Sequence, residues 1–317
     1  MSDTEVKTGI FEGMSFADYA AIPALNNGVL QWGRVSALHL HAAISGELER
    51  ADTDAMRFGR ALHVRLLEPG RYKADVAISM PCAAILKSGD RKGEPCGKSS
   101  TYRNEAGEWL CGTHGKGLPE IYDAITSGEA ARIECIAASL KNHPGERLRI
   151  HPGKYEVVLV GEILGLTVKC RLDKWMDNPR AVLDVKKVAA PAMPGAPNAG
   201  EYSFSGRIAS MGYGCQAALY LDVLKQLTGH DHDWYWLAVE DGPPYGVAVY
   251  KASDATIAAG RAEYLEMLHM VVECRKTGLW PGYTKSVETI DGPEWWIKRH
   301  NTGGLEGGEE VEQRIAF

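Results

Sequence analysis

The chain has 317 residues, 45% of them hydrophobic, which is enough to bury the core of one large domain or two modest ones. The formal net charge of -6 excludes an overall positive field, so any binding of nucleic acid needs a local basic groove or metal ions. No run approaches the roughly 20 apolar residues that span a bilayer, and the N-terminus lacks a signal-peptide pattern, which predicts a cytoplasmic protein without membrane contact. Seven cysteines, an odd number, favour reduced thiols, some of them bound to metal.

The first part of the chain predicts helices. "VLQWGRVSALHLHAAISG" (29–46) is amphipathic. A stronger helix follows, in which apolar residues recur at helical spacing between Met56 and Leu67 and Pro69-Gly70 ends the run. His63 lies within this second helix.

Between residues 80 and 117 the sequence becomes rich in Gly, Lys, Ser and Cys and loses its periodicity, which indicates an inserted irregular module. A helix is expected from about Pro119 to Lys141. "YEVVLV", "LTVKCRLDKWM" and "AVLDVKKV" then predict three strands of an antiparallel meander, because short turn clusters separate them.

The last part of the chain predicts a long helix over 203–229, two strands at 234–240 and 245–253, and a helix over 254–277. A Pro/Gly/Ala loop at 189–202 precedes them, and loops of this length are often functional. The order of the elements favours an α/β or α+β fold, with a central mixed sheet flanked by helices and one Cys-rich insertion.

Asp184 and Lys186 lie two apart on a predicted strand, so their side chains point to the same side. The turn "DNPR" pairs this strand with the preceding one and brings Asp173 close to Asp184. Two neighbouring carboxylates favour a cation between them, and oxygen ligands suit Mg²⁺ or Mn²⁺. A lysine beside them suits metal-assisted hydrolysis of a phosphodiester. The alternative is a surface ion pair on a solvated strand, worth roughly 0–1 kcal/mol.

Four stretches resemble, in order, the motifs of the PD-(D/E)XK nuclease superfamily, and specifically the RecE-like phage exonucleases: "FGRALHVRLLEP", "LTVKCRLDKW", "LDVKKV" and "GYGCQAALYLDVL". The resemblance covers most of the chain and implies one nuclease domain over 1–317 with a restriction-endonuclease-like core. It implies metal ligation by His63, Asp173, Asp184 and the main-chain carbonyl of Val185, and orientation of the attacking water by Lys186. Gln216 and Tyr220 would line the site and contact DNA, and Glu156 would assist a second metal ion.

The resemblance also implies an activity. Such enzymes are Mg²⁺-dependent deoxyribonucleases that degrade linear double-stranded DNA from the 5′ end, in recombination or phage DNA processing. They commonly form a homo-oligomeric ring around DNA and work with a strand-annealing protein. Two alternatives stay open: a catalytically weak protein that binds DNA ends or a partner on the same scaffold, and a single-strand nuclease of the superfamily that carries an iron–sulfur cluster.

The insertion at 80–117 presents Cys82, Cys96, Cys111 and His114. Three thiolates and an imidazole make a tetrahedral zinc set, and the C-x-x-H pair at 111–114 suits one metal ion. The segment has too few apolar residues to fold alone, so structural zinc would supply the missing folding energy. The alternative is a disordered surface loop with incidental cysteines. The basic residues of the insertion could also contact the phosphates of a DNA strand; they are Lys87, Arg91, Lys92 and Lys98.

Overall fold

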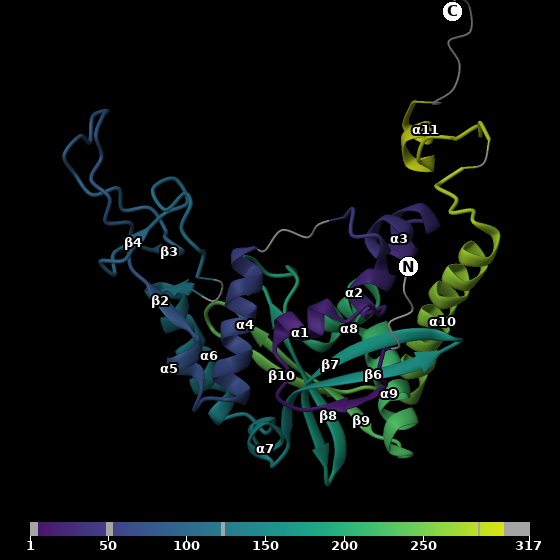
Figure 1. Ribbon diagram of the computed structural model, residues 1–317. Coiled ribbons are helices and arrows are strands. Elements are labelled where there is room, and N and C mark those ends of the chain that lie inside the picture. The colour runs from purple at the N-terminus through teal and green to yellow at the C-terminus, as the bar shows by residue number, and fades with distance from the viewer. Residues whose placement is uncertain (1–5, 49–52, 122–123, 285, 301–317) are drawn as a thin grey trace, which may run out of the picture.

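The computed structural model describes residues 6–48, 53–121, 124–284 and 286–300. Its centre is a six-stranded mixed sheet with the strand order β1-β6-β7-β8-β9-β10 (Figure 1). The strands are β1 (Gly9–Phe11), β6 (Lys154–Ile163), β7 (Leu166–Asp177), β8 (Arg180–Val188), β9 (Asp233–Glu240) and β10 (Val247–Lys251). The predicted meander of three strands is present as β6, β7 and β8, which pair antiparallel in sequence order.

The sheet splits where β7 and β8 stop pairing. These two strands are joined only from Asp177↔Arg180 to Lys174↔Leu183. Beyond that point β7 stays with β6 as far as Ile163↔Leu166, whereas β8 continues in parallel beside β9. We call this divergence the sheet fork. Past the fork, the described parts of β7 and β8 no longer pair with each other.

Helices cover both faces of the sheet, with α4, α5 and α6 on one side and α9 and α10 on the other (Figure 1). Each face carries its own hydrophobic core. Successive residues of β8 point into opposite cores, with Val182 on the α9 side and Leu183 on the α4 side. The helices are α1 (Phe16–Ala21), α2 (Asn27–Leu30), η1 (Gln31–Arg34), α3 (Ala37–Ile44), α4 (Asp54–Leu67), α5 (Tyr72–Asp75), α6 (Ser127–Lys141), α7 (Glu146–Ile150), α8 (Glu201–Ser210), α9 (Tyr213–Thr228), α10 (Asp254–Thr277) and α11 (Glu294–His300).

Two helix predictions need correction. The helix expected from Pro119 begins only at Ser127, because Thr126 and Glu129 form a capping box there. The chain just before it forms β5 (Ala124–Thr126), which pairs in parallel with β2 (Ala77–Ser79); residues 122–123 lie outside the described residues. The long helix over 203–229 is two helices, α8 and α9, because Gly212 between them adopts a left-handed conformation with φ of 67°.

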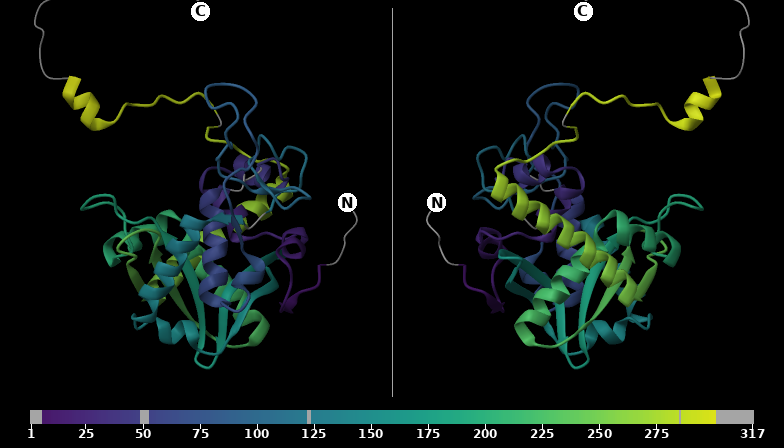
Figure 2. Two further views of the ribbon diagram at one scale, coloured as in Figure 1. Left: turned by 90° about the vertical axis from the view of Figure 1, so that its left-hand side faces the viewer. Right: turned by 90° about the vertical axis from the view of Figure 1, so that its right-hand side faces the viewer.

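The segment between β2 and β5 contains the short hairpin of β3 (Tyr102–Arg103) and β4 (Trp109–Leu110). It stands apart from the sheet in Figure 1 and lies above the sheet in both views of Figure 2. In the described part of the chain, no helix combines the length and the apolar character needed to cross a membrane. The expected fold class, a central mixed sheet flanked by helices with a Cys-rich insertion, is confirmed.

Candidate active site

Three carboxylates form a row across neighbouring strands at the sheet fork. Glu156 of β6 lies opposite Asp173 of β7, because the flanking residues pair as Tyr155↔Lys174 and Val157↔Leu172. Asp184 of β8 is next in the same row, one position beyond the last β7–β8 pair. Like charges placed opposite each other on a sheet are destabilising. The row is therefore a place where a cation stabilises the fold.

Glu156 interrupts its strand with a φ of 51°, a left-handed conformation that non-glycine residues rarely adopt. Tyr155 packs with the α4-side core and Val157 with the α9-side core, although residues two apart in a strand normally share a face. The strand thus changes face at Glu156. Backbone strain of this kind is concentrated at functional sites.

His63 reaches the fork from α4. Its Nδ1 lies 3.5 Å from Asp173 Oδ2, and its Nε2 lies 3.1 Å from the carbonyl oxygen of Val185. The amide of Val185 donates to Asp173 Oδ2 at 2.8 Å, so that carboxylate replaces the strand partner that β8 loses at the fork. His63, Glu156 and Asp173 each offer a ligand atom, and these atoms lie within 4.8 Å of one another.

Asp184 is held from the opposite side by Lys186 and Gln216. Its Oδ1 accepts from Lys186 Nζ at 2.9 Å and from Gln216 Nε2 at 3.1 Å, and Lys186 also donates to Gln216 Oε1 at 2.9 Å. Asp184 Oδ2 lies 2.7 Å from the ammonium but accepts no well-aligned hydrogen bond among the described residues, although Asp184 is only 2% exposed. Within the described part of the chain, that buried oxygen is held by the ammonium alone, whose place a metal ion can take.

Burial raises the pKa of Asp184 to about 6, with Lys186 opposing this effect and the Asp173 charge adding to it. Burial and the Asp173 charge likewise raise the pKa of Glu156 to about 7. Burial alone would lower the pKa of Lys186, but the charges of Asp184 and Asp173 outweigh it and the pKa is raised. The nearby cations therefore do not fully offset the negative charge of the carboxylates at the fork. A set of oxygen ligands with one imidazole suits Mg²⁺ or Mn²⁺.

A cavity of about 1240 Å³ opens onto the fork, and His63, Glu156 and Asp173 line it. Asp184, Lys186 and Gln216 lie behind this lining. Tyr220 also contributes to the wall, but it is only 7% exposed and its ring packs edge-on against Trp234. The cavity gives a substrate direct access to the His63 side of the fork.

The structure also brings together the four predicted ligands of the insertion. Nδ1 of His114 lies 3.4 Å from Sγ of Cys82 and 3.4 Å from Sγ of Cys111, and Sγ of Cys96 lies 4.0 Å from Sγ of Cys111. The edges of a tetrahedral zinc site are about 3.5–3.8 Å, from the usual Zn–S and Zn–N bond lengths. The set can hold a metal ion.

The surroundings of Cys111 favour the thiolate form of its side chain. Burial by itself raises the pKa of its thiol, but backbone N–H groups of His114 and Thr113 point at the sulfur and lower the pKa to about 6 overall. The thiolate is the form that binds metal.

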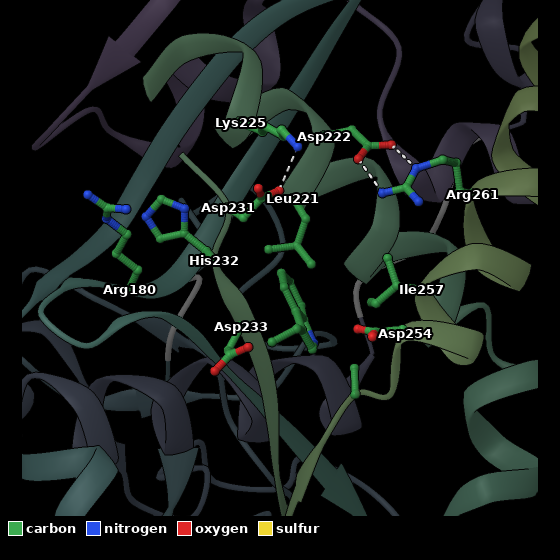
Figure 3. Close-up of a pocket in the computed structure, with 12 residues that line it drawn as sticks. Arg180, Leu221, Asp222, Lys225, Asp231, His232, Asp233, Asp254, Ile257 and Arg261 are labelled. Atoms are coloured by element: carbon green, nitrogen blue, oxygen red, sulfur yellow. Dashed lines mark hydrogen bonds and ion pairs between the residues drawn. The ribbon is translucent and has the colours of Figure 1, made fainter. Parts of the chain in front are cut away.

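A second cavity of about 510 Å³ lies elsewhere, beside the start of β9 (Figure 3). Arg261 donates two hydrogen bonds to Asp222 there, at 2.7 and 2.6 Å, and Lys225 pairs with Asp231 at 2.7 Å. None of the sequence-predicted site residues lines it. Its charged side chains mainly connect α9 with α10 and the start of β9.

Sequence reasoning missed two parts of the candidate active site. Arg171 lies two residues before Asp173, and its Nε is 2.8 Å from Glu156 Oε2. The spacing was a usable signal, because residues two apart on a strand share a face. The chain around α1, from Glu12 to Ala20, forms one wall of the cavity, and only tertiary packing places it there.

Comparison with known proteins agrees with this architecture. The model of a family described as "PDDEXK-like domain of unknown function (DUF3799)" matches residues 29–293. A crystal structure from Eubacterium rectale, of a protein provisionally named an exonuclease, superposes with a TM-score of 0.56 at 13% identity, covering 92% of this chain and 100% of that one. The crystal structure of SSO0001 matches with a TM-score of 0.24 at 16% identity, over 43% of this chain and 67% of that one. No curated protein matches the sequence.

Proposed function

The chain belongs to the family of PDDEXK-like domains described as DUF3799, and from that premise we propose that it is a Mg²⁺-dependent exonuclease that degrades linear double-stranded DNA from the 5′ end. Membership confirms the PD-(D/E)XK fold and supports nuclease activity in general. The single observation that carries metal-dependent hydrolysis is the fork itself, whereas the duplex substrate and the 5′ polarity rest on the likeness to RecE-like exonucleases. At the fork an imidazole and a row of carboxylates meet beside a lysine, on strands whose pairing fixes them.

We propose that His63, Glu156 and Asp173 hold one divalent ion, with Asp184 Oδ2 and the Val185 carbonyl available to the same ion or to a second one. When bound, such an ion polarises a phosphoryl oxygen and lowers the pKa of a water molecule. These residues fit the ion because they supply hard oxygen atoms, one of them buried without a hydrogen bond.

Lys186 has a distinct role in this proposal. Its ammonium contacts both carboxylate oxygens of Asp184 and Oε1 of Gln216, so we propose that Lys186 exchanges one of these contacts for the attacking water when an ion binds Asp184. Gln216 contacts both Asp184 and Lys186, and we propose that it positions these two groups and that, with Tyr220, it lies along the path of the DNA.

Digestion of duplex DNA labelled at either the 5′ or the 3′ end, with titration of Mg²⁺ and Mn²⁺, tests the proposal. We expect label release from the 5′ end, no cutting of covalently closed circles, and loss of at least about 10²–10³-fold in rate for Asp184→Asn and for Lys186→Ala. If both variants digest DNA at the parental rate, the fork is not the catalytic site. Faster release from single strands than from duplex would instead favour a single-strand nuclease.

We propose in addition that the insertion binds structural Zn²⁺ through Cys82, Cys96, Cys111 and His114. Two buried thiols lie 3.4 Å from the imidazole and the third lies 4.0 Å from Cys111, distances close to those of a tetrahedral site. Elemental analysis of the purified protein should give one zinc per chain. Absence of zinc from protein purified under reducing conditions would contradict this proposal.

Two proposals concern partners. We propose a homo-oligomeric ring that encloses duplex DNA, as the likeness to RecE-like exonucleases implies, because positive charge concentrated on an inner surface would reconcile DNA binding with the net charge of -6. We also propose a strand-annealing protein as the partner that receives the exposed strand, in recombination or phage DNA processing. Light scattering of the full chain tests the first proposal, and co-purification with a candidate annealing protein tests the second.

A further inference from the structure

An aromatic side chain stands in the cavity wall close to the proposed metal ligands. Phe16 is the first residue of α1, lines the cavity and is 47% exposed. A single exposed apolar residue is ordinary on a protein surface. Phe16 differs because its exposed face belongs to the cavity that leads to the sheet fork.

Arg171 connects this ring to the fork. Its guanidinium carbon lies 5.4 Å from the centre of the Phe16 ring, and its Nε lies 2.8 Å from Glu156 Oε2. A single guanidinium therefore separates the aromatic ring from the group formed by His63, Glu156 and Asp173. Anything that stacks on Phe16 lies beside the place where phosphodiester hydrolysis is proposed.

Phe16 is held on a rigid support. The buried side chain of Lys169, on β7, donates three hydrogen bonds to the C-terminal end of α1, to the carbonyl oxygens of Tyr19 at 2.9 Å, Ala20 at 2.9 Å and Ile22 at 2.7 Å. Just before α1, β1 pairs antiparallel with β6. The wall is therefore fixed to two strands of the central sheet, and a ring on it is already in place before a ligand arrives.

The cations around the cavity are largely neutralised. Arg71 pairs with Glu68 and Asp75, and Lys154 pairs with Glu12 at 2.9 Å. Arg171 pairs with Glu156. These side chains offer little uncompensated charge to a phosphate, so at this end of the cavity the aromatic face can add affinity to that of the ion proposed at the fork. Every nucleobase has a complementary π-face.

We propose that Phe16 is a stacking platform for the nucleobase at the end of a DNA strand whose adjoining phosphodiester bond lies at the fork. This inference rests on the proposed nuclease function and adds a base-binding subsite to it. Stacking would also let a protein with a net negative charge bind a strand end next to the carboxylates of the sheet fork.

The test uses oligonucleotides with 2-aminopurine at either the 5′ or the 3′ terminus, whose fluorescence falls when the base stacks. Binding to the full chain is measured with Ca²⁺ in place of Mg²⁺, and a denaturing gel confirms that the oligonucleotide stays intact. For the parent we expect quenching with one of the two labelled ends. For Phe16→Ala we expect loss of that quenching and weaker binding by roughly 5- to 150-fold, the effect of removing one base–aromatic stack.

Matched variants separate stacking from wall structure. Phe16→Tyr keeps an aromatic face and should retain quenching, whereas Phe16→Leu keeps apolar bulk and should lose it. Tyr202→Ala removes an aromatic side chain that is 96% exposed and lies outside the cavity lining, and should change neither signal. Parental quenching and affinity in Phe16→Ala, or full rescue by Phe16→Leu, would overturn the proposal. DNA digestion by the parent is measured in parallel, so failure of the nuclease proposal is recognised separately.

Discussion

The described part of the chain contains two places able to hold a metal ion, and they are built in opposite ways. At the sheet fork the candidate ligands stand on long strands and on α4, between two large hydrophobic cores. In the insertion the candidate ligands stand on loops, and the cluster around Cys82, Cys96 and Cys111 adds only three partly buried apolar residues. The fold prepares the first site for an ion, whereas we propose that the second site depends on an ion to fold. Four experiments test this difference between the two candidate metal sites.

The largest expected effect is at the insertion. Cys111→Ser removes one of four ligands from a proposed site of a type whose whole metal-linked folding energy is about 10–16 kcal/mol, so a large part of that energy is lost. We expect amides of residues 80–117 to lose protection from hydrogen exchange while those of β8 keep theirs. Cys135→Ser, at an exposed cysteine of α6, is the control. Equal loss of protection in β8 would show that the two regions are not independent.

The next effect is at the fork. Glu156→Gln keeps the shape of the side chain but removes its charge, and should weaken Mn²⁺ binding by about 100-fold or more. The folded state should survive, because the strands and both cores are untouched. Isothermal titration with Mn²⁺ measures the affinity, and thermal unfolding without metal measures the stability. An unchanged affinity would remove Glu156 from the ligand set.

A smaller effect is expected from Gln216, which touches both Asp184 and Lys186. Gln216→Ala should lower the rate of DNA digestion by about 10- to 100-fold, as for other residues that orient metal ligands. Gln226→Ala is a matched change on the same helix, whose side chain contacts the backbone of Glu162 instead. That variant should digest DNA at the parental rate, and an equal loss in both would indicate a general disturbance of α9.

The smallest effect is a pH dependence of stability. The pKa values of Asp184 and Glu156 are raised by burial to about 6 and about 7, so the folded state binds more protons than the unfolded state between about pH 4 and pH 7. Their contribution to the free energy of unfolding is full below the unfolded pKa values and is lost as pH rises through 6 to 7.

Added Mg²⁺ should reverse this trend, because the ion binds the deprotonated acids. Thermal unfolding at pH 6 and pH 8, with and without Mg²⁺, should show the larger stabilisation by the ion at pH 8. The variant Glu156→Gln should have a flatter profile without metal. An identical response to Mg²⁺ at both pH values would contradict proton–metal competition at the fork.

Much of this architecture could be predicted from local pattern. Alternation along β8 put Asp184 and Lys186 on one side, and the turn after β7 placed Asp173 near them. The C-x-x-H spacing indicated the Cys/His group that the fold assembles. These features depend on residues a few positions apart or on one hairpin, so periodicity and turn chemistry suffice.

The rest depends on contacts between distant segments. The sequence around Glu156 does not predict its positive φ, which accompanies the change of face of β6 at the fork. The α1 wall depends on Lys169, about 150 positions away, and its three carbonyl partners. The parallel pair β2–β5 joins strands of three residues, too short for any periodic signal. The narrower likeness to RecE-like exonucleases and the single-domain assignment stay predictions.

The parallel pairing of β2 and β5 bears on how the Cys/His segment is joined to the rest of the chain. Ala77 lies opposite Ala124 and Ser79 opposite Thr126, so the end of β2 and the start of β5 are about 8 Å apart but at opposite ends of the ladder. Parallel strands cannot be joined by a tight turn and need a longer crossover connection. The segment that carries Cys82, Cys96, Cys111 and His114 is this crossover, so a metal ion that orders it would also hold β2 and β5 side by side.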